Sequence, residues 1–517
     1  MARYKDYSYD QTKLIPIAFH RQVLPGSFEY TLNYLIDHEV DLSVFESRYR
    51  NDETGAPAYD PAILLKVILY AYSRGVVSSR EMARLCRENV VMMALSADSA
   101  PHFTTIAEFI SSMSEEVTVM FRDVLLYCDE LGWIGKDLFA IDGCKLSSNA
   151  AREWSGTKAD LKKKQTKMER AVRYLLKRHR ELDGSEGDDP VMERERQQLK
   201  TLREKVKKLK RWLSENEDKP GKTGKPRKSN LTDNESAKIK GAHGIIQGYD
   251  GVATVDAKHQ VIVHAEAFGE AQEHDLLMPM VEGTRENFQA IGKDPDVFTT
   301  TKLTADAGFH TERNMQGLFE AGIDGYVADN LFRKRDPRFA EAHRHKERER
   351  EGREKARRRG GAVFTNRDFH YEPEQKLCIC PAGRKLYRNG GNVVINGYQA
   401  VKFRAPKSAC RPCGLRAQCL RHPHRTEVRQ VHFFSGETPN RPETFTQKMK
   451  RKIDSVLGRF IYGRRLATVE PVFANMTCAK GLNRFTLRSK RKVDIQWKLY
   501  CIVHNIGKVH RYAAGFG

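Results

Sequence analysis

Residues 138–143 read Leu138-Phe139-Ala140-Ile141-Asp142-Gly143, an apolar run that ends in an acid and a glycine. A short, continuous apolar run of this kind is typical of a strand that is buried on both faces. Residues 303–309 repeat the arrangement, with Asp306 after the strand and Gly308 in the turn that follows. We therefore predict two buried strands, and each of them carries an aspartate at its end.

A third acid, Glu470, lies in the stretch 467–473, which has the pattern of an amphipathic helix. Two strand-end aspartates and a helical glutamate can hold two divalent cations, which activate the attacking oxygen and stabilise the leaving oxygen of a phosphodiester. The ions also offset the cost of burying ionised carboxylates. We expect Asp142, Asp306 and Glu470 to be catalytic and to bind two Mg²⁺ or Mn²⁺ ions. Either aspartate alone could instead cap a turn or a helix.

The charge of the chain indicates the kind of substrate. Its 517 residues include 89 Lys and Arg against 67 Asp and Glu, which gives a net charge of +22. A basic excess of this size suits a polyanionic partner, although a surface that only keeps the protein in solution is the alternative. We expect the phosphodiester to belong to double-stranded DNA.

The segments around the three acids follow a definite order. A period-two pattern predicts a hairpin at 252–265, and helical patterns follow at about 274–290 and 311–321. A further strand is predicted at 325–328, after the one that ends at Asp306. The order is therefore three strands, a helix, a strand, a helix and a strand.

Several of these segments resemble the signature segments of bacterial insertion-sequence transposases of the DDE class. They are FAIDG at 139–143, TADAGF at 304–309, VEPVF at 469–473, KGLNRF at 480–485 and HNIGKV at 504–509. The predicted order of strands and helices matches the RNase H-like core of that family. The segment 59–82 resembles its InsH-type helical N-terminal domain.

The resemblance implies an activity and its partners. A transposase of this class binds the terminal inverted repeats of its own element and nicks the DNA with water, and the 3′-OH then attacks target DNA. Two DNA ends in one complex imply a homodimer. The alternatives are a transposase-derived DNA-binding protein without catalysis and a plain nuclease with the same core. No apolar run is long enough for a membrane span, and the expected location is the bacterial cytoplasm, in association with the nucleoid.

The predicted fold class is α/β, with an all-helical domain before an RNase H-like core that has a mixed five-stranded sheet. The helical domain, 1–135, is expected to bind DNA ends, although packed helices without DNA contact are the alternative. A basic helical hairpin with a flexible tail interrupts the core at 151–239, and its outer face is either solvated or in contact with DNA. A second insertion, 331–455, has a basic arm at 333–359 and a cysteine-containing β-rich patch. The core itself takes 136–150, 240–330 and 456–517.

Five basic residues are candidates for contact with the DNA backbone: Lys145, Arg464, Arg465, Lys480 and Arg484. In the family that the chain resembles, a tyrosine and an arginine precede the glutamate and a lysine follows it. Tyr462 and the two arginines match the first part with a slightly different spacing. Thr477 stands where the lysine is expected, so Lys480 departs from the pattern. Arg484, and Lys490 as a further candidate, could each equally be a surface charge.

A group of cysteines lies between the second aspartate and the glutamate. Two of them have the CxxC spacing of a tetrahedral zinc site, and two more complete a set of four ligands. The set is Cys380, Cys410, Cys413 and Cys419. Cys378 could compete with Cys380, and His422 or His424 could replace a cysteine. We expect a structural zinc ion, and the alternative is a group of reduced thiols packed in a small β-rich domain.

Overall fold

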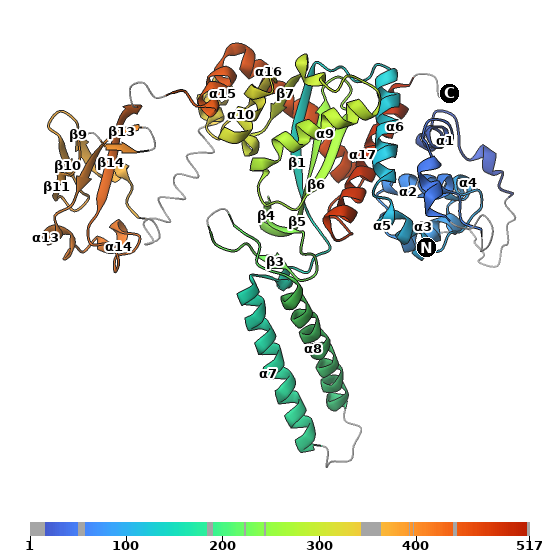
Figure 1. Cartoon of the computed structure of the whole chain (residues 1–517), viewed down its shortest axis with the longest axis horizontal. Helices are drawn as coiled ribbons and strands as arrows, with labels where there is room; N and C mark the ends of the chain where they lie inside the picture. The colour runs from blue at the N-terminus through green and yellow to red at the C-terminus, as the bar shows by residue number, and fades with distance from the viewer. Residues whose placement is uncertain are drawn as a thin grey trace, which may run out of the picture. The chain divides into compact units, whose positions relative to one another are not determined.

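The computed structural model describes residues 16–49, 57–182, 190–221, 224–241, 244–342, 363–391, 393–395, 398–437 and 442–513. The chain forms two compact units (Figure 1), and each is described by itself. The first comprises residues 1–329 with 455–517, and the second comprises residues 330–454. Most of the predicted basic arm at 333–359 lies outside the described residues.

The first unit is built on a mixed β-sheet. Its strands are β1 (Leu138–Ser147), β4 (Ala237–Gly241), β5 (Gly244–Asp256), β6 (Ile262–Phe268), β7 (Lys302–Ala305) and β8 (Gly325–Val327). The order across the sheet is β6-β5-β1-β7-β8, and β4 pairs with the beginning of β5. β5 runs antiparallel to β1, β4 and β6, whereas β1, β7 and β8 run parallel. This arrangement is RNase H-like, and the predicted fold class is confirmed.

The apolar runs seen in the sequence account for the centre of this sheet. Residues 138–141 of β1 are fully buried, as are Leu303 and Ala305 of β7. Helices cover both faces of the sheet: α9 packs against β5 and β6, and α16 packs against β1, β7 and β8. The helices that accompany the sheet are α9 (Leu277–Ala290), α10 (Glu312–Glu320), α16 (Val456–Ala474) with a π-helical turn at Asn475–Ala479, and α17 (Lys490–Tyr512).

α17 is buried along most of its length and joins the sheet to the N-terminal helices. On the sheet side, Trp497 Nε1 donates to the carbonyl of Val252 at 3.0 Å. Asn505 both accepts from the backbone nitrogen of Ile262 and donates to its carbonyl, each at 2.9 Å. On the other side, the ring of Tyr500 lies 5.0 Å from that of Tyr72. The helix predicted from residue 493 is therefore a central part of the core.

The N-terminal region is helical, as the sequence predicts. Its helices are α1 (Phe28–His38), α2 (Pro61–Ser73), α3 (Ser79–Glu88), α4 (Val90–Leu95), α5 (Phe103–Ser112) and α6 (Glu116–Glu130). α2 has Pro61 in its first turn and is capped by Asp60, whose Oδ1 accepts from Ala62 N at 2.8 Å. Ser78 stands at the N-cap of α3, but its side chain makes no capping hydrogen bond. α1, α2, α5 and α6 all contact α17, so these helices belong to the same unit as the sheet.

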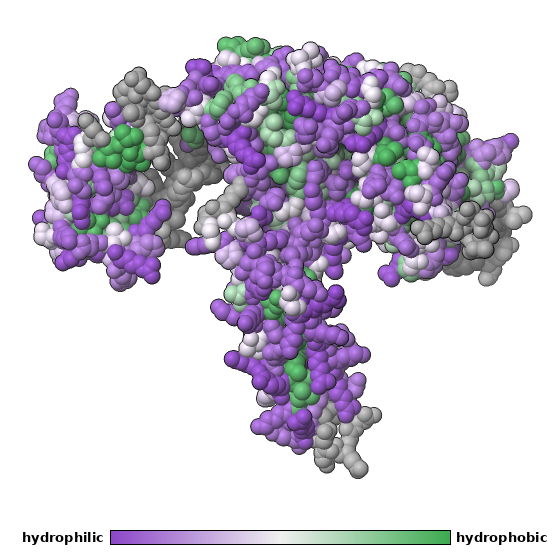
Figure 2. Space-filling view, viewed as in Figure 1, coloured by the Kyte–Doolittle hydropathy of each residue, from purple (hydrophilic) through white to green (hydrophobic). Residues whose placement is uncertain are grey.

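A helical hairpin leaves the sheet between β1 and β4. It consists of α7 (Lys158–Leu182) and α8 (Pro190–Glu215), which lie side by side in Figure 1 and contact each other. Its apolar seam includes Leu161, Leu209 and Trp212, all of them buried. Figure 2 shows that the rest of its visible surface is mostly hydrophilic.

The tail after the hairpin, which is predicted to be flexible, ends in a short buried strand. Ser229 and Asn230 form β3, are fully buried, and pair with β2 (Ser155–Gly156). The amide of Asn230 donates to the carbonyl of Ala151 and to Ser155 Oγ, each at 2.9 Å. Its side-chain oxygen also accepts from the backbone nitrogens of Thr232 and of residue 233. With these hydrogen bonds, the buried Asn230 closes the base of the hairpin. The polar composition of the tail does not predict this contact.

The second unit is a small β-rich fold. Its strands are β9 (His370–Glu372), β10 (Leu377–Ile379), β11 (Lys385–Arg388), β12 (Val393–Ile395), β13 (Tyr398–Arg404) and β14 (Gln430–Glu437). Its short helices are α11 (Phe332–Arg335), α13 (Lys407–Cys410) and α14 (Arg416–Cys419), and α15 (Phe445–Asp454) is longer. The buried cluster is Phe369, Cys378, Leu386, Phe403, Ala405, Cys410, Val428 and Val431. Across both units, no described helix is long and apolar enough to span a bilayer.

Candidate active site

The parallel pairing of β1 and β7 brings the two predicted aspartates together. Ile141 is in register with Ala305, so Asp142 lies beside Asp306, the residue that follows the end of β7. The predicted end of the first strand at Asp142 is wrong, because β1 continues to Ser147 through its pairing with β5, and Asp142 therefore lies in the middle of the strand. Carboxyl ends of adjacent parallel strands meet at one edge of a sheet, and ligands commonly bind there. Two carboxylates that are far apart in the sequence thus share one place in the fold.

Asp142 is held by an arginine from α16. Arg465 Nη1 donates to Asp142 Oδ2 at 2.7 Å, and Gly143 N donates to Oδ1 at 2.9 Å. Arg465 itself is buried, and its guanidinium lies 5.8 Å from the ring centre of Tyr462. Burial raises the pKa of Asp142, and nearby Asp306 raises it further, while Arg465 acts in the opposite direction. The guanidinium is thus the main counter-charge of this carboxylate.

Asp306 begins the short 3₁₀ helix Ala307–Phe309. Its Oδ1 accepts from Gly308 N at 2.7 Å. Burial raises the pKa of Asp306, and the neighbouring carboxylate of Glu273 raises it further. Ionisation of either aspartate therefore has an electrostatic cost, and a bound cation would relieve it.

Two further acids surround this pair, and the sequence analysis missed both. Glu273, on the 3₁₀ turn Glu273–Asp275, is buried and forms an ion pair with Lys145, Nζ to Oε1 at 2.5 Å. Asp250 on β5 is fully buried opposite Lys145, and neither of its carboxylate oxygens has a hydrogen-bond partner. Burial, followed by the repulsion of Glu273, raises the pKa of Asp250 well above its ordinary value.

The glycines after the two aspartates leave room for these acids. A Cβ at Gly143 would lie 2.6 Å from Asp250 Oδ1, and a Cβ at Gly308 would collide with Glu273 Oε2. The signal for Asp250 was present in the sequence, because it too is an acid followed by a glycine in a strand. Glu273 lies in a polar stretch between elements, and nothing local marks it.

Glu470 is not assembled with the aspartates in this structure. It is exposed on α16, whereas the buried face of that helix contains Arg465, Val469 and Val472. At about 100° per residue, Glu470 lies roughly 140° around the helix from Arg465, which points at Asp142. Within the described ranges, no three His, Cys, Asp or Glu side chains are grouped so that they could hold a metal ion.

The five candidate DNA contacts occupy different settings. Lys145 and Arg465 are engaged with acids of the site. Arg464 is exposed, and Arg484 is exposed with a 3.2 Å hydrogen bond from its Nη2 to Asn149 Oδ1. Lys480 is partly buried, and burial lowers its pKa. Of the five, Arg464 and Arg484 are the most exposed and therefore the most accessible to a DNA backbone.

The four predicted zinc ligands gather in the second unit. Cys380, Cys410, Cys413 and Cys419 all line one small cavity of about 30 Å³. Cys378 does not line it and is fully buried in the apolar cluster, while His422 and His424 are exposed. Burial raises the pKa of Cys419 to about 11, and the other three cysteines are close enough to add to that rise. The four thiols are thus neighbours, although they are not arranged as a ready metal-binding group.

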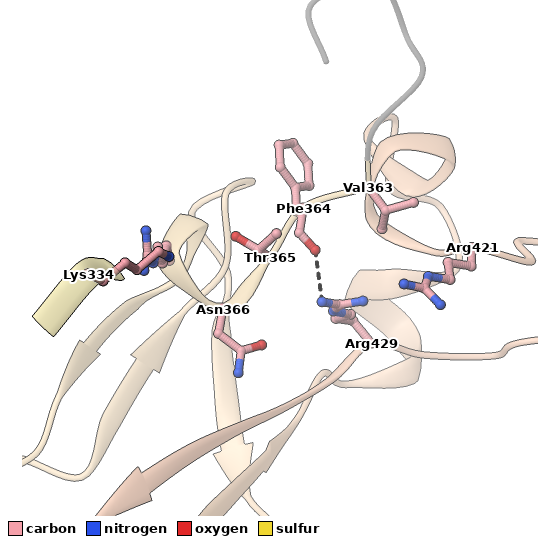
Figure 3. A pocket seen from close by; sticks show the side chains of 8 residues that line it. Lys334, Val363, Phe364, Thr365, Asn366, Arg421 and Arg429 are labelled. Carbon is pink, nitrogen blue, oxygen red and sulfur yellow. Dashed lines mark hydrogen bonds between the residues drawn. The ribbon is translucent and has the colours of Figure 1, made fainter. Parts of the chain in front are cut away.

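An open basic hollow of about 790 Å³ lies in the same unit (Figure 3). Its cations come from Lys334, Arg367, Arg421 and Arg429. Arg429 Nη2 donates to the carbonyl of Phe364 at 2.9 Å, the bond drawn in Figure 3, and its Nη1 donates to the carbonyl of Cys419 at 3.2 Å. Arg429 also lines the cysteine cavity, so one side chain connects the two features.

Comparison with known protein families gives two matches. Residues 18–112 match a transposase domain family, and residues 379–510 match a transposase DDE domain family. The first match covers α1 to α5, and the second covers the four cysteines, Glu470 and most of α17. Neither covers Asp142 or Asp306. No curated protein matches the chain.

Proposed function

The chain belongs to the DDE transposases of insertion sequences, and on that premise we propose that it cleaves DNA at the ends of its own element and joins them to target DNA. It binds the terminal inverted repeats, cleaves strands with activated water, and transfers the 3′-OH end. The observation that carries the proposal is the placement of Asp142, in the middle of β1, beside Asp306 at the end of β7. The alternative, a transposase-derived DNA-binding protein without catalysis, gives no reason for buried, mutually repelling acids.

The residues at this edge of the sheet fit divalent cations, Mg²⁺ or Mn²⁺. Asp142 and Asp306 are adjacent hard oxygen donors, and both are buried with raised pKa values, so that a cation offsets their repulsion. When bound, two such ions activate the attacking oxygen and stabilise the leaving oxygen of a phosphodiester. Arg465 orients Asp142, and Lys145 fixes Glu273 next to Asp306. The same site serves attack by water and attack by a 3′-OH, so no covalent protein intermediate is required.

The experiment that tests the proposal uses DNA that carries the element's ends. In Mg²⁺, the purified chain is expected to nick this DNA and to join the ends to a second DNA molecule. Cleavage without joining would make the chain a plain nuclease. End binding without cleavage would support the non-catalytic alternative.

The third acid of the site is tested separately. We propose Glu470, from its motif, as the partner of the two aspartates, while Glu273 is the acid packed beside Asp306. Glu470→Gln is expected to lower the cleavage rate at least about a hundredfold, because it removes a charge that acts on the reacting groups. Glu273→Gln is expected to lower it less than about tenfold, because Glu273 acts only through its neighbours. The single-turnover cleavage rates of the two variants are compared. A larger loss in Glu273→Gln than in Glu470→Gln would make Glu273 the third acid of the site.

We also propose that the helical hairpin contacts the DNA backbone. Residues 158–230 contain 24 Lys and Arg and 13 Asp and Glu, so they carry +11, half of the net charge of the chain. Flexible point charges bind phosphates without distinguishing sequences, so end recognition is assigned to the N-terminal helices. Two DNA ends need two active sites, and the functional form is proposed to be a homodimer.

Neutralising exposed lysines of the hairpin tests this role. A variant with glutamine at Lys163, Lys167, Lys207 and Lys208, all exposed, is expected to bind every DNA more weakly by a similar factor. The slope of log affinity against log salt should flatten by about 0.9 for each DNA phosphate that the variant no longer neutralises. Fluorescence anisotropy over a range of salt measures both quantities.

The matched control places arginine at the same four positions and is expected to retain the slope. The ratio of end affinity to random-DNA affinity should survive in both variants. If neutralisation removes that preference while non-specific affinity is unchanged, the hairpin itself recognises the sequence.

A further inference from the structure

We infer that the second unit binds one structural zinc ion in the cavity lined by Cys380, Cys410, Cys413 and Cys419. This site is independent of the acids of the first unit, and its role is to stabilise the β-rich fold. The turns that present the sulfurs, the charges around them and the small local core all favour such an ion.

The first sulfur is presented by a tight turn between β10 and β11. Gly383 N donates to the carbonyl of Cys380 at 2.8 Å, and Cys380 N donates to the carbonyl of Arg384 at 2.9 Å. Gly383 has a φ of +71°, which a residue with a side chain rarely adopts. The turn aims Arg384 N at Cys380 Sγ, at 3.4 Å. The turn thus fixes the direction of this side chain and supplies the sulfur with a backbone donor, as the groups around a metal ligand commonly do.

The other three sulfurs come from one short segment around α13 and α14. Cys410 ends α13, Cys413 follows in the next turn, and Cys419 ends α14. Arg416 ties this segment together, because its guanidinium donates to the carbonyls of Cys410 at 3.0 Å, Glu427 at 2.8 Å and Thr426 at 2.7 Å. Two separate parts of the unit thus deliver their cysteines to one cavity.

The charges around the cavity suit a zinc ion with four thiolates. Such a centre has a net charge of about −2, since four thiolates surround one divalent ion. Three arginines line the cavity, Arg384, Arg416 and Arg429, and Arg416 Nη1 lies 4.0 Å from Cys410 Sγ. Arg416 and Arg429 also donate hydrogen bonds to backbone carbonyls, and their positive charge would in addition stabilise an anionic metal centre.

The small buried core of this unit is a reason to expect that a metal ion stabilises it. Among the described residues of this unit, the buried cluster around the cysteines has eight members, and Cys410 is one of them. Small domains with limited cores commonly depend on a metal or on disulfides. All the cysteines of the described chain are free. The thiols are close but not arranged as a closed ligand set, so the ion must draw them together by side-chain rotation.

Elemental analysis of the full-length protein, purified without added metal, tests the inference. We expect about one zinc per chain in the wild type and in Cys378→Ala, which removes the buried thiol outside the cavity. Cys410→Ser with Cys413→Ser should lose the zinc and show faster proteolysis within residues 363–437, because structural zinc binding is coupled to folding. His422→Ala with His424→Ala should retain it.

A second measurement does not depend on how the double variant folds. Wild-type protein exchanged with Co²⁺ is expected to show the absorption of a tetrahedral site with four sulfur ligands, and Cys380→Ser or Cys419→Ser should reduce its thiolate-to-metal intensity. Wild type that contains no zinc and takes up neither Zn²⁺ nor Co²⁺ in its reduced form overturns the inference. So does a Cys410→Ser, Cys413→Ser protein that keeps a full complement of zinc.

Discussion

Asp142→Asn and Asp306→Asn are each expected to reduce strand cleavage by at least about a thousandfold while end binding is nearly unchanged. Each substitution removes one negative charge from the paired aspartates without changing the shape of the side chain. Cleavage of end-bearing DNA in Mg²⁺ and a binding titration of the same DNA are the two measurements. Loss of cleavage together with intact binding places the residue in the chemistry.

For Asp306→Asn, unfolding is not expected to be the cause of that loss. Burial raises the pKa of Asp306, so the folded protein disfavours its ionised form. The stabilising contribution of Asp306 is complete below its unfolded pKa and is lost as the pH rises through the folded one. At neutral pH, Asp306→Asn should therefore be at least as stable as the wild type.

Asp123→Asn is the matched control for both substitutions. Asp123 is also a partly buried acid with a pKa raised by burial, to about 6, but it lies on α6 away from the site. The Asp123→Asn variant should cleave end-bearing DNA at the wild-type rate. A near wild-type cleavage rate in Asp142→Asn or Asp306→Asn would remove that aspartate from the assignment.

Arg465→Met is expected to lower the free energy of unfolding by about 3–5 kcal/mol, since it leaves the buried carboxylate of Asp142 without its partner. The adjacent Arg464 is exposed, and Arg464→Met should change stability by less than about 0.5 kcal/mol. The free energies of unfolding of the two variants are measured by denaturant titration and compared. If they are equally stable, the ion pair does not support the site.

Mg²⁺ extends this test, because a cation bound at Asp142 can take over the counter-charge that the guanidinium supplied. Added Mg²⁺ should stabilise Arg465→Met more than it stabilises the wild type. In the double variant Arg465→Met, Asp142→Asn, this extra stabilisation should disappear. A Mg²⁺ effect that is the same in all three proteins would show that the ion binds elsewhere.

The parts that local patterns could predict are those in which neighbours in the sequence are also neighbours in the fold. Apolar runs placed Asp142 and Asp306 in or after buried strands, and the parallel pairing of these strands brings the two residues together. The continuation of β1 beyond Asp142 was not predicted, because it depends on pairing with β5. The four cysteines could be proposed as a group because their spacing, and the glycine of the turn after Cys380, are visible in the sequence. The fold class is confirmed, whereas the assignments of the catalytic and zinc-binding residues stay predictions.

What local patterns missed depends on contacts across the fold. Glu273 belongs to the acid cluster only because its turn packs against Gly308, and the sequence around it is ordinary. The face that Glu470 occupies depends on the rotation of α16, which Arg465 fixes through Asp142. The buried Asn230 closes the hairpin base through partners that lie before α7. None of these contacts produces a periodic pattern in the amino-acid sequence.

α17 has a consequence for how the protein is made. Both the sheet and the N-terminal helices depend on a helix that leaves the ribosome after all of them. Until it emerges, β5 and β6 lack the side chains that bond to Val252 and Ile262, and α2 lacks the partner of Tyr72. A nascent chain therefore keeps this apolar surface exposed until residues 490–512 have emerged. A product of translation that stops before residue 490 has no segment to cover it.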